Sequence, residues 1–412
     1  MSRVAMLVWN EFRNDARVLK EAQTLQRAGH NVTVFALHTP GITLPSETLH
    51  EKISVVRVCR SPFWKLRKGK TRSVGPNLRS SGPVPDLSPA RRVLHIVARL
   101  WTHAALLWSI VKFRPDIVHS HDVNTLPTCW LAAKISRARL VYDAHEISTS
   151  REGYSNFRNL VAFVERHLMP RADGTITTTT ARAKFFARAY AITRPLVLQN
   201  RPRLQAPHQT SRIREELGLK NPWPIILYQG GIQQGRGLER LVRVAAEVTD
   251  TYFVFIGGGR LDQTLRTLAA QLQLEERVHF IQTVSLDELP IYTASADIGV
   301  QPIENTCLNH YTTDSNKLFE YVQAGLPVVA SDLPEIRQVV KNHDLGLLVQ
   351  PGNDEALALA LQHLSKNEVI RKYHAAKALQ AAQSLNWEAQ ENTLVDLYRR
   401  VLKFEQAASR RV

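Results

Sequence analysis

Short apolar runs alternate with amphipathic segments along the first half of the chain. The apolar runs predict buried strands at residues 4–9, 31–37, 116–122, 140–146 and 174–179. The segments between them predict helices at 16–29, from Thr125 onward and around 160–169. Buried strands separated by helices are typical of a parallel sheet that is covered on both faces. The first half therefore predicts a doubly wound α/β domain.

The same alternation begins again after a proline-marked segment, residues 195–224, which we interpret as a linker. The later predicted strands are 225–231, 251–259, 277–282, 297–303, 328–330 and 346–349, with helices from Leu238, Leu261 and Ser315 and near 286–294. We expect a first domain at 1–200, a second at 201–385 and, within 386–412, an amphipathic helix that packs back on the first domain. Two such sheets would place a ligand cleft between the carboxyl ends of their strands.

The bulk composition is that of a folded protein of two domains. The chain has 412 residues, of which 44% are hydrophobic, and this length exceeds what one ordinary core accommodates. Its three cysteines are far apart and lack metal or redox spacing, so we expect a reducing, cytoplasmic compartment. The opening MSRVAMLVWNEF lacks a small-residue cleavage site and is expected to form a strand, not a signal peptide.

The most apolar long segment is residues 93–111. It is interrupted by His95, Arg99 and His103, and a charge at the bilayer centre costs about 2.5–3.5 kcal/mol. We therefore expect a helix packed on a sheet, with a helix at a membrane interface as the open alternative.

The net charge of +16 calls for an explanation. Residues 57–92 contain ten Lys or Arg against one acid, Asp86, and also carry Phe63 and Trp64. This composition predicts a basic loop inserted in the first domain, suited to an anionic membrane surface on the inner face of the membrane. No nucleic-acid-binding motif accompanies the charge, so no nucleic acid is expected. A solvated loop without a partner remains open.

The segment DSNKLFEYVQAGLPVVASD, residues 314–332, predicts a helix that begins at polar residues and ends at Gly325 before a strand. Such a helix start is suited to an anion. The glycine-rich GGIQQGRGLE, residues 230–239, follows the first strand of the second domain. Arg236 and Lys317 could then bracket a diphosphate, and Glu320 could accept hydrogen bonds from ribose hydroxyls. A surface role for Glu320 and a purely steric one for the glycines are the alternatives.

Several motifs in the same order resemble a known family. They are NDARVLKEAQTLQRAGHNVTVFA (14–36), PDIVHSHD (115–122), YDAHE (142–146), ERHLMPRADGTITTTT (165–180), NKLFEYVQAGLPVVASD (316–332) and NWEAQENTLVDLYRRVL (386–402). Over nearly the whole chain they are similar to bacterial retaining glycosyltransferases of family 4, which have the GT-B fold. The resemblance implies a nucleotide-diphosphate sugar donor, UDP- or GDP-linked, on the second domain. It further implies an acceptor on the first domain, no other cofactor and no required metal.

The resemblance also assigns roles to single residues. Glu320 matches the second glutamate of the family's Glu-x7-Glu motif, which holds the donor ribose, and Arg236 matches the basic residue at the donor diphosphate. His145 matches the histidine of the first domain that faces the donor sugar; a capped strand-end histidine is the alternative. We expect His145, Arg236 and Lys317 to act in catalysis. The expected donor-binding residues are Gly230, Gly231, Arg236, Thr312, Thr313, Asp314, Ser315, Asn316, Lys317, Leu318 and Glu320.

Two positions depart from the family pattern. Thr312 stands where the motif has its first glutamate, and Gly231 stands where an arginine is usual. The loop 309–315 must therefore meet the sugar through backbone N–H groups or through Thr312, Thr313 or Asp314. The acceptor-side candidates are Asn14, Asp15, Arg17, His121 and Asp122, although a salt-bridged helix residue is an equal interpretation of Arg17.

Three functions stay open at this point. The first is a retaining, metal-independent transferase that builds a polysaccharide, lipopolysaccharide or glycolipid on a saccharide or membrane-associated acceptor. Its leaving diphosphate would be stabilised by N–H groups, Arg236 and Lys317, and the acceptor would pass its proton to the departing phosphate oxygen. The second is a nucleotide-sugar epimerase on the same scaffold, and the third is a non-catalytic binder of nucleotides or nucleic acid.

Overall fold

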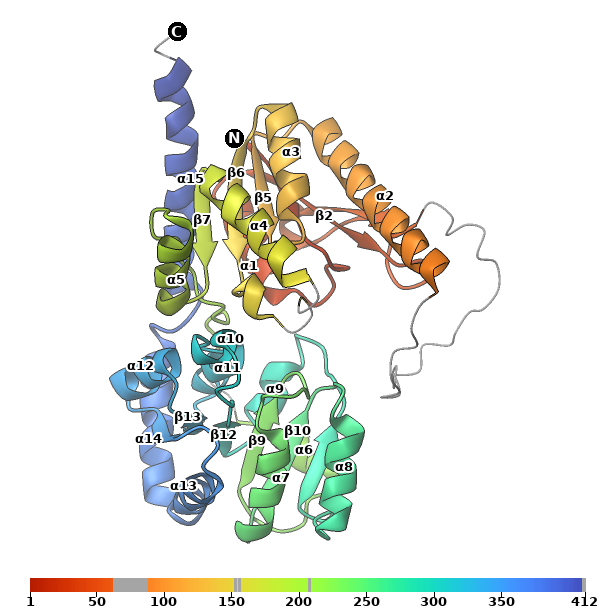
Figure 1. The fold of residues 1–412 in the computed structure, drawn as a ribbon. Helices are drawn as coiled ribbons and strands as arrows, with labels where there is room; N and C mark the ends of the chain where they lie inside the picture. Colours follow the sequence, from red (N-terminus) through yellow and green to blue (C-terminus); the bar gives the residue numbers. More distant parts are fainter. Residues whose placement is uncertain (62–87, 152–153, 155–156, 207–208, 410–412) are drawn as a thin grey trace. The chain divides into compact units, whose positions relative to one another are not determined.

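The computed structural model describes the whole chain except residues 62–87, 152–153, 155–156, 207–208 and 410–412 (Figure 1). Most of the predicted basic loop, with Phe63, Trp64 and Asp86, lies outside the described residues. The chain forms two compact units, one of Met1–Leu198 with Glu391–Val412 and one of Gln199–Gln390. The last segment thus belongs to the first unit.

The first unit is built on an eight-stranded sheet with the strand order β3-β4-β2-β1-β5-β6-β7-β8. Its strands are β1 (Arg3–Leu7), β2 (Asn31–His38), β3 (Ser46–Thr48), β4 (Ser54–Cys59), β5 (Ile117–His121), β6 (Arg139–Ala144), β7 (Gly174–Thr177) and β8 (Leu196–Val197). Its helices include α1 (Ala16–Arg27), α2 (Pro89–Phe113), α3 (Leu126–Ser136), α4 (Arg158–Leu168), α5 (Thr180–Tyr190) and α15 (Glu388–Ser409). All neighbouring strands pair in parallel except β3 with β4. The order reverses between β1 and β5, so the loops after these two strands flank the crevice at which doubly wound sheets bind ligands.

The second unit is built on a six-stranded parallel sheet with the order β11-β10-β9-β12-β13-β14. Its strands are β9 (Ile225–Gln229), β10 (Tyr252–Ile256), β11 (Val278–Ile281), β12 (Ile298–Gln301), β13 (Val328–Ser331) and β14 (Gly346–Val349). Its helices include α6 (Arg212–Leu217), α7 (Leu238–Glu247), α8 (Asp262–Gln271), α9 (Leu289–Thr293), α10 (Leu308–Tyr311), α11 (Asn316–Gln323), α12 (Pro334–His343), α13 (Asp354–Lys366) and α14 (Glu368–Ala382). The switch point of this order lies between β9 and β12.

Alternate residues of β9 explain why its apolar run is continuous. Ile225 and Leu227 lie in one buried cluster, and Ile226 and Tyr228 lie in another. Because successive side chains of a strand point to opposite faces, both faces of the sheet are covered. The prediction of two doubly wound domains is confirmed.

The C-terminal helix α15 is fixed to the first unit by a buried contact. Tyr398 is fully buried, and its hydroxyl lies 2.8 Å from Nδ1 of His119 on β5. The expected return of this helix to the first domain is therefore observed.

Two local predictions were wrong. Arg57, placed in the basic loop, lies on β4 and is buried, and its guanidinium donates to the carbonyls of Glu11 and Leu44. The interpretation of 195–224 as a plain linker missed β8 and α6, because a two-residue strand and a six-residue helix carry little periodicity.

Candidate active site

The donor candidates of the second unit gather at the switch point of its sheet. The turn after β9 contains Gly230 and Arg236, and the helix α11, which carries Lys317 and Glu320, comes between β12 and β13. Tyr321 ties α11 to the sheet, because its buried hydroxyl donates 2.9 Å to the carbonyl of Leu227 on β9. The sheet thus fixes the helix start next to the glycine turn.

Lys317 is a buried cation that forms no ion pair with any residue the structure describes. Its side chain is 8% exposed, and Nζ lies 4.9 Å from the ring centre of Tyr228 and 3.5 Å from the hydroxyl of Ser315. A Cβ added to Gly230 would lie 3.5 Å from this ammonium. Burial, with the nearby charge of Arg236, lowers the pKa of Lys317 to about 7 despite Glu320. An ammonium held in this way gains strongly from an anionic ligand.

Glu320 is held at the edge of the sheet by a hydrogen bond from β9. The amide of Gln229 donates 2.6 Å to Oε2 of Glu320, while its oxygen accepts a hydrogen bond from Thr293 on α9 at 2.8 Å. Glu320 is only partly buried. Its carboxylate is oriented and keeps acceptor capacity for a ligand hydroxyl.

The glycine turn is shaped by close backbone packing. Gly237 has φ +70°, and a Cβ at this position would lie 2.0 Å from the carbonyl oxygen of Pro302. Gly230 has φ +121°. Both need glycine for steric reasons, so the turn by itself does not indicate a phosphate. Gly231 carries no such strain, and an added Cβ there would make ordinary contacts.

In the loop before α11, two residues that were predicted to contact the donor, Thr312 and Asp314, instead bond to other groups of the protein. The hydroxyl of Thr312 donates 2.7 Å to the carbonyl of Leu308, and the carboxylate of Asp314 accepts from the amide of Gln199 at 2.8 Å. Both side chains are buried, as is that of Thr313. These bonds position the loop, and any contact of these residues with a donor stays a prediction.

Ser315 has a backbone conformation that few side chains adopt. It precedes α11 with φ +56° and ψ +130°, and its side chain does not cap the helix. Its backbone N–H instead bonds to the hydroxyl of Thr313 at 3.2 Å. Non-glycine residues with positive φ are uncommon and are often found at functional sites. Asn316 and Leu318 follow in the first turn, and Leu318 is fully buried.

In the first unit, Arg17 forms a buried ion pair. Its guanidinium donates to both oxygens of Asp143 on β6, at 2.8 and 3.0 Å, and to the carbonyl of Leu198 at 2.7 Å. It also lies 3.1 Å from the carboxylate of Glu21. The salt-bridge interpretation of Arg17 therefore describes its observed contacts.

His145 lies at the open side of this ion pair. Its Nε2 is 3.1 Å from Oδ2 of Asp143 and 3.3 Å from Nδ1 of His121, and its Nδ1 is 3.9 Å from Asp122. Burial opposes the charged form, but the carboxylates of Asp122 and Asp143 outweigh it and raise the pKa of His145 to about 9. Arg17 and His145 hold the pKa of Asp143 well below its usual range, although burial acts the other way. His145 is therefore an imidazolium at neutral pH.

The remaining acceptor-side candidates lie at the switch point of the same sheet. Asp15 caps α1 by accepting from the N–H of Val18 at 3.2 Å, and Asn14 beside it is exposed. Asp122 follows β5 with φ +61°. The structure thus brings His121, Asp122 and His145 together and leaves Asn14 pointing to solvent.

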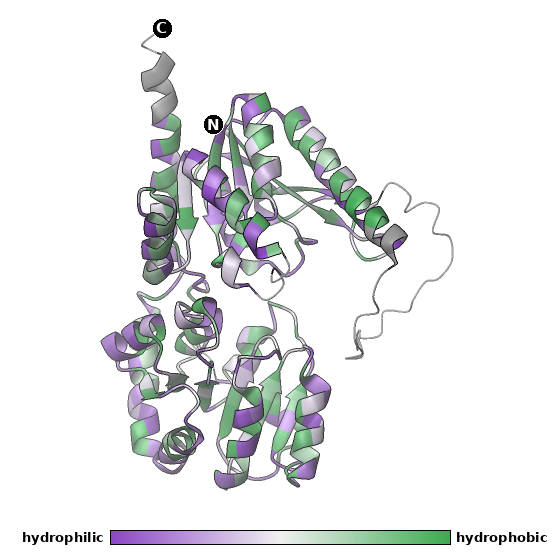
Figure 2. Ribbon diagram, in the orientation of Figure 1, coloured by the Kyte–Doolittle hydropathy of each residue, from purple (hydrophilic) through white to green (hydrophobic). Residues whose placement is uncertain are grey.

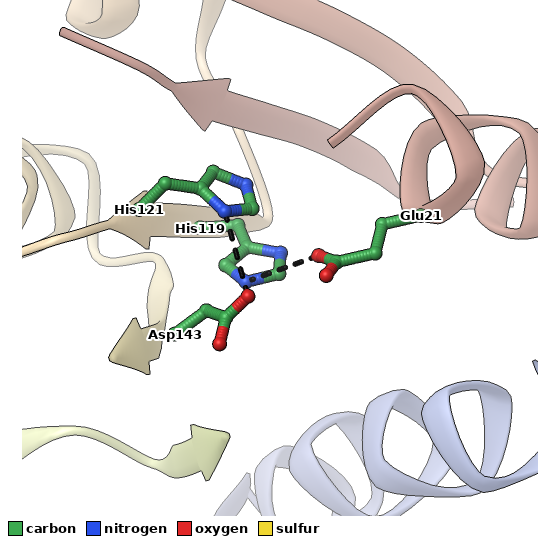
Figure 3. A group of neighbouring side chains, drawn as sticks. All are labelled: Glu21, His119, His121 and Asp143. Carbon is green, nitrogen blue, oxygen red and sulfur yellow. Dashed lines mark ion pairs between the residues drawn. The ribbon is translucent and has the colours of Figure 1, made fainter. Parts of the chain in front are cut away.

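Four buried side chains of the first unit converge on one another (Figure 3), and they are Glu21, His119, His121 and Asp143. Their nearest ligand-type atoms all lie within 4.8 Å of one another, a spacing that could hold a metal ion. Arg17 already binds the carboxylates of this group, and a fixed cation would repel a second one. Burial and Asp143 raise the pKa of Glu21 well above its usual range. We interpret the group as a charge network, and the predicted independence from metal stays a prediction.

Sequence reasoning missed Glu21, His119, Asp143 and Gln229. A signal was present for Asp143, which precedes His145 by two residues at the end of the same predicted strand. Glu21 lies four residues after Arg17, on the same helix face. Nothing in the sequence pairs Gln229 with Glu320, because they are 91 residues apart.

Two family models match this chain. The model of glycosyl transferases group 1 matches residues 209–382, and that of the glycosyl transferase 4-like domain matches residues 15–200. The chain belongs to these GT-B glycosyltransferases. The matched ranges correspond to the two structural units, and the predicted family is confirmed.

Three similar proteins illustrate the family. D-inositol 3-phosphate glycosyltransferase of Corynebacterium efficiens is 26% identical over 77% of this chain and 83% of that protein. Phosphatidyl-myo-inositol mannosyltransferase of Mycobacterium leprae is 24% identical over 94% of this chain and 92% of that protein. The structure of Anabaena HepE with UDP-glucose superimposes with a TM-score of 0.70 at 17% identity, over 99% of this chain and all of that one. The last likeness supports the fold.

Proposed function

We propose that this glycosyltransferase is a retaining enzyme that takes a sugar from a nucleotide-diphosphate sugar without a metal. The proposal of a donor site rests on Lys317, whose buried ammonium has no carboxylate partner in the described structure. Lys317 lies beside the glycine turn and 2 residues after Ser315, which has a positive φ. A diphosphate would supply the missing negative charge. The UDP-glucose complex of HepE supports a UDP-linked donor, and a GDP-linked donor is the second candidate.

The remaining donor contacts follow from this placement. Glu320, oriented by Gln229 at 2.6 Å, would accept from the ribose hydroxyls. Arg236 and Lys317 would hold the two phosphates and stabilise the negative charge that develops when the sugar–phosphate bond breaks. The acceptor hydroxyl would pass its proton to the departing phosphate oxygen on the same face, which retains the anomeric configuration. The chain therefore needs no paired carboxylates for this reaction.

We propose that the acceptor binds at the switch point of the first unit, near Asn14, Asp122 and His145. The raised pKa of His145, about 9, supports an electrostatic role for its imidazolium toward the donor sugar or its leaving group. The names of the relatives from Corynebacterium efficiens and Mycobacterium leprae favour a phosphorylated or lipid-linked polyol acceptor. A role in cell-surface polysaccharide or glycolipid synthesis, in the cytoplasm at the inner face of the membrane, is the wider proposal.

A thermal-shift screen tests the donor proposal. The purified protein is heated with UDP, GDP, ADP, CMP and their sugar conjugates, with and without EDTA. We expect one diphosphate family to raise the melting temperature selectively and equally in EDTA, because ligands that bind only the folded state stabilise it. A shift that EDTA abolishes would refute independence from metal, and no shift from any nucleotide would refute the donor site.

A further inference from the structure

The chain passes between its two units twice, at residues 198–199 and 390–391, and the second unit joins the two crossings by hydrogen bonds. The amide oxygen of Gln390 accepts from the backbone N–H of Gln199 at 3.0 Å, and its amide nitrogen donates to the backbone carbonyl of Gln199. Two residues further on, Arg201 donates 2.9 Å to the carbonyl of Ser384. The segment that enters the second unit is therefore fixed to the segment that leaves it.

The side chain of Gln199 extends this connection to the loop before α11. Its amide nitrogen donates 2.8 Å to Oδ2 of Asp314, and its amide oxygen accepts from Nε of Arg201 at 2.9 Å. The guanidinium of Arg201 lies 5.7 Å from the ring centre of Phe319 on α11, and its charge interacts with that of Asp314. Asp314 is only 5% exposed. A hydrogen bond and a nearby cation thus hold its buried carboxylate.

Helix α11 itself is fixed by its apolar side. Figure 2 shows β9 and β10 as largely hydrophobic, and Leu318 and Phe319 of α11 pack in the same buried cluster as Leu227 of β9. The residues just before the helix are polar, and hydrogen bonds decide where polar side chains of this kind point. The direction of the Asp314 carboxylate therefore depends on its polar partners.

Two groups of the proposed donor site would attract the carboxylate of Asp314 if it were not held. The first is the ammonium of Lys317, because side chains three residues apart lie on the same side of a helix. The second is the set of free N–H groups at the start of α11, where acidic side chains are favoured. The donor diphosphate would need both groups. A carboxylate at this place would compete with the diphosphate and repel it.

We propose that Gln199 is a positioning residue of the donor site, which holds the carboxylate of Asp314 away from Lys317. With Asp314 bound to Gln199, the charged groups that act on Lys317 are Arg236 and Glu320. The ammonium is thereby kept for the donor. The inference rests on the proposed donor site, in which it gives Asp314 a supporting role. It also explains why one side chain joins the crossing of the chain to the loop before α11.

Gln199→Glu in the full chain tests this inference. Glutamate has nearly the same shape and can still accept from Arg201, but it cannot donate to Asp314 and repels it. The matched control is Gln205→Glu, which adds the same charge to the same segment at an exposed position. The rescue variant combines Gln199→Glu with Asp314→Asn, because the new amide can donate to the new carboxylate.

Donor affinity is measured by calorimetry with the nucleotide sugar selected in the thermal-shift screen. We expect Gln199→Glu to weaken binding about tenfold, the loss expected for one hydrogen bond to a charged group. The control should bind like the natural protein, and the rescue variant should recover most of the loss. Natural affinity in Gln199→Glu, or a rescue variant as weak as Gln199→Glu, would overturn the inference. An equal loss in the control would do so too, since the added charge alone would then explain it.

A second measurement does not depend on the donor. The rate at which an amine-reactive reagent labels Lys317, followed by mass spectrometry over a range of pH, gives the pKa of this ammonium in each variant. A carboxylate beside an ammonium raises its pKa. The pKa of Lys317 should therefore rise in Gln199→Glu and return to that of the natural protein in the rescue variant. A purely structural role of Gln199 would leave this pKa unchanged, and that result would overturn the inference.

A further variant covers the case in which Gln199→Glu does not fold. Arg201→Gln removes the cation beside Asp314 and should shift both measurements in the same direction as Gln199→Glu. Failure of the donor site itself has a different signature, because the natural protein would then bind no nucleotide in the screen. That result would refute the donor site and the inference together, whereas natural donor binding that none of these variants changes would refute the inference alone.

Discussion

The two units both bury cations at the carboxyl edges of their sheets, but they treat them differently. In the first unit the guanidinium of Arg17 is matched by the carboxylate of Asp143 at 2.8 and 3.0 Å. In the second unit the ammonium of Lys317 has no carboxylate partner among the described residues, and its pKa is lowered to about 7. A buried cation that is paired with a carboxylate contributes to the stability of the fold. A buried cation without a carboxylate is destabilising until an anionic ligand binds beside it. The comparison therefore assigns a structural role to Arg17 and a ligand-binding role to Lys317.

The largest expected effect is on stability, at the paired cation. Arg17→Ala leaves Asp143 and Glu21 buried without their counter-charge, and breaking such a pair costs about 3–5 kcal/mol. Chemical denaturation should therefore show a large loss in the free energy of unfolding. Arg337→Ala, which removes an exposed ion pair with Asp332, is the matched control and should change stability little. If both substitutions lowered the free energy of unfolding by the same amount, the buried ion pair of Arg17 would be no more important for stability than the exposed one of Arg337.

The next effect is on donor affinity at unchanged stability. Arg236→Ala and Glu320→Gln each remove a charge-assisted contact, so nucleotide-sugar binding should weaken by about 1–3 kcal/mol, measured by calorimetry. Arg243→Ala, on the exposed side of α7, removes the same charge as Arg236→Ala and should leave binding unchanged. Unaltered binding by both site variants would refute the arrangement of the donor site.

A smaller effect is the pH dependence of donor binding. In the free protein Lys317 loses its proton as pH rises through about 7, and a bound diphosphate favours the protonated form. Affinity should therefore fall as pH rises from 7 to 9, by up to roughly tenfold per pH unit. Calorimetry at pH 8 in buffers of different ionisation enthalpy should show proton uptake. Lys317→Arg, which stays charged, should remove most of this dependence, and the same slope in both proteins would contradict the assignment.

The smallest effect is the pH dependence of stability at His145. Its pKa is raised from 6.5 to about 9, so its contribution is fully present below pH 6.5 and is lost as pH rises through about 9. The melting temperature of the natural protein should fall more steeply between pH 7 and 10 than that of His145→Asn. Parallel curves would mean that His145 is neutral in the folded protein.

The sequence predicted those elements of the fold that have a clear pattern of apolar and polar residues. The long apolar runs of both sheets, the helix starts at Thr125 and Ser315 and the returning C-terminal helix were all recognised, because burial on two faces leaves a clear pattern. It did not predict β4, because Arg57 was counted with the basic stretch that follows it. The fold buries Arg57 through contacts with Glu11, Leu44 and Glu47, which lie far from it in the sequence. Short elements such as β8 and α6 were missed for want of periodicity.

The candidate site was predicted where a single motif carries it. Lys317 and Glu320 lie on the same short helix, which leads directly into the next strand. Their proximity therefore follows from the local sequence alone. The partners that orient them do not, since Gln229 reaches Glu320 and Gln199 reaches Asp314 across long separations in sequence. The same holds for helix α2. Its apolar pattern predicted a core helix, and only the structure shows that this helix has an apolar face on both sides.

The most direct test of the account is the binding of the nucleotide sugar selected in the screen to Lys317→Met, in EDTA. This substitution keeps the length of the side chain and removes a buried charge that has no ion-pair partner in the described structure. The account predicts a protein at least as stable as the natural one that binds the donor about 10- to 100-fold more weakly, the loss expected for one hydrogen bond to a charged group. Donor affinity equal to that of the natural protein would contradict the claim that Lys317 is completed by the donor diphosphate.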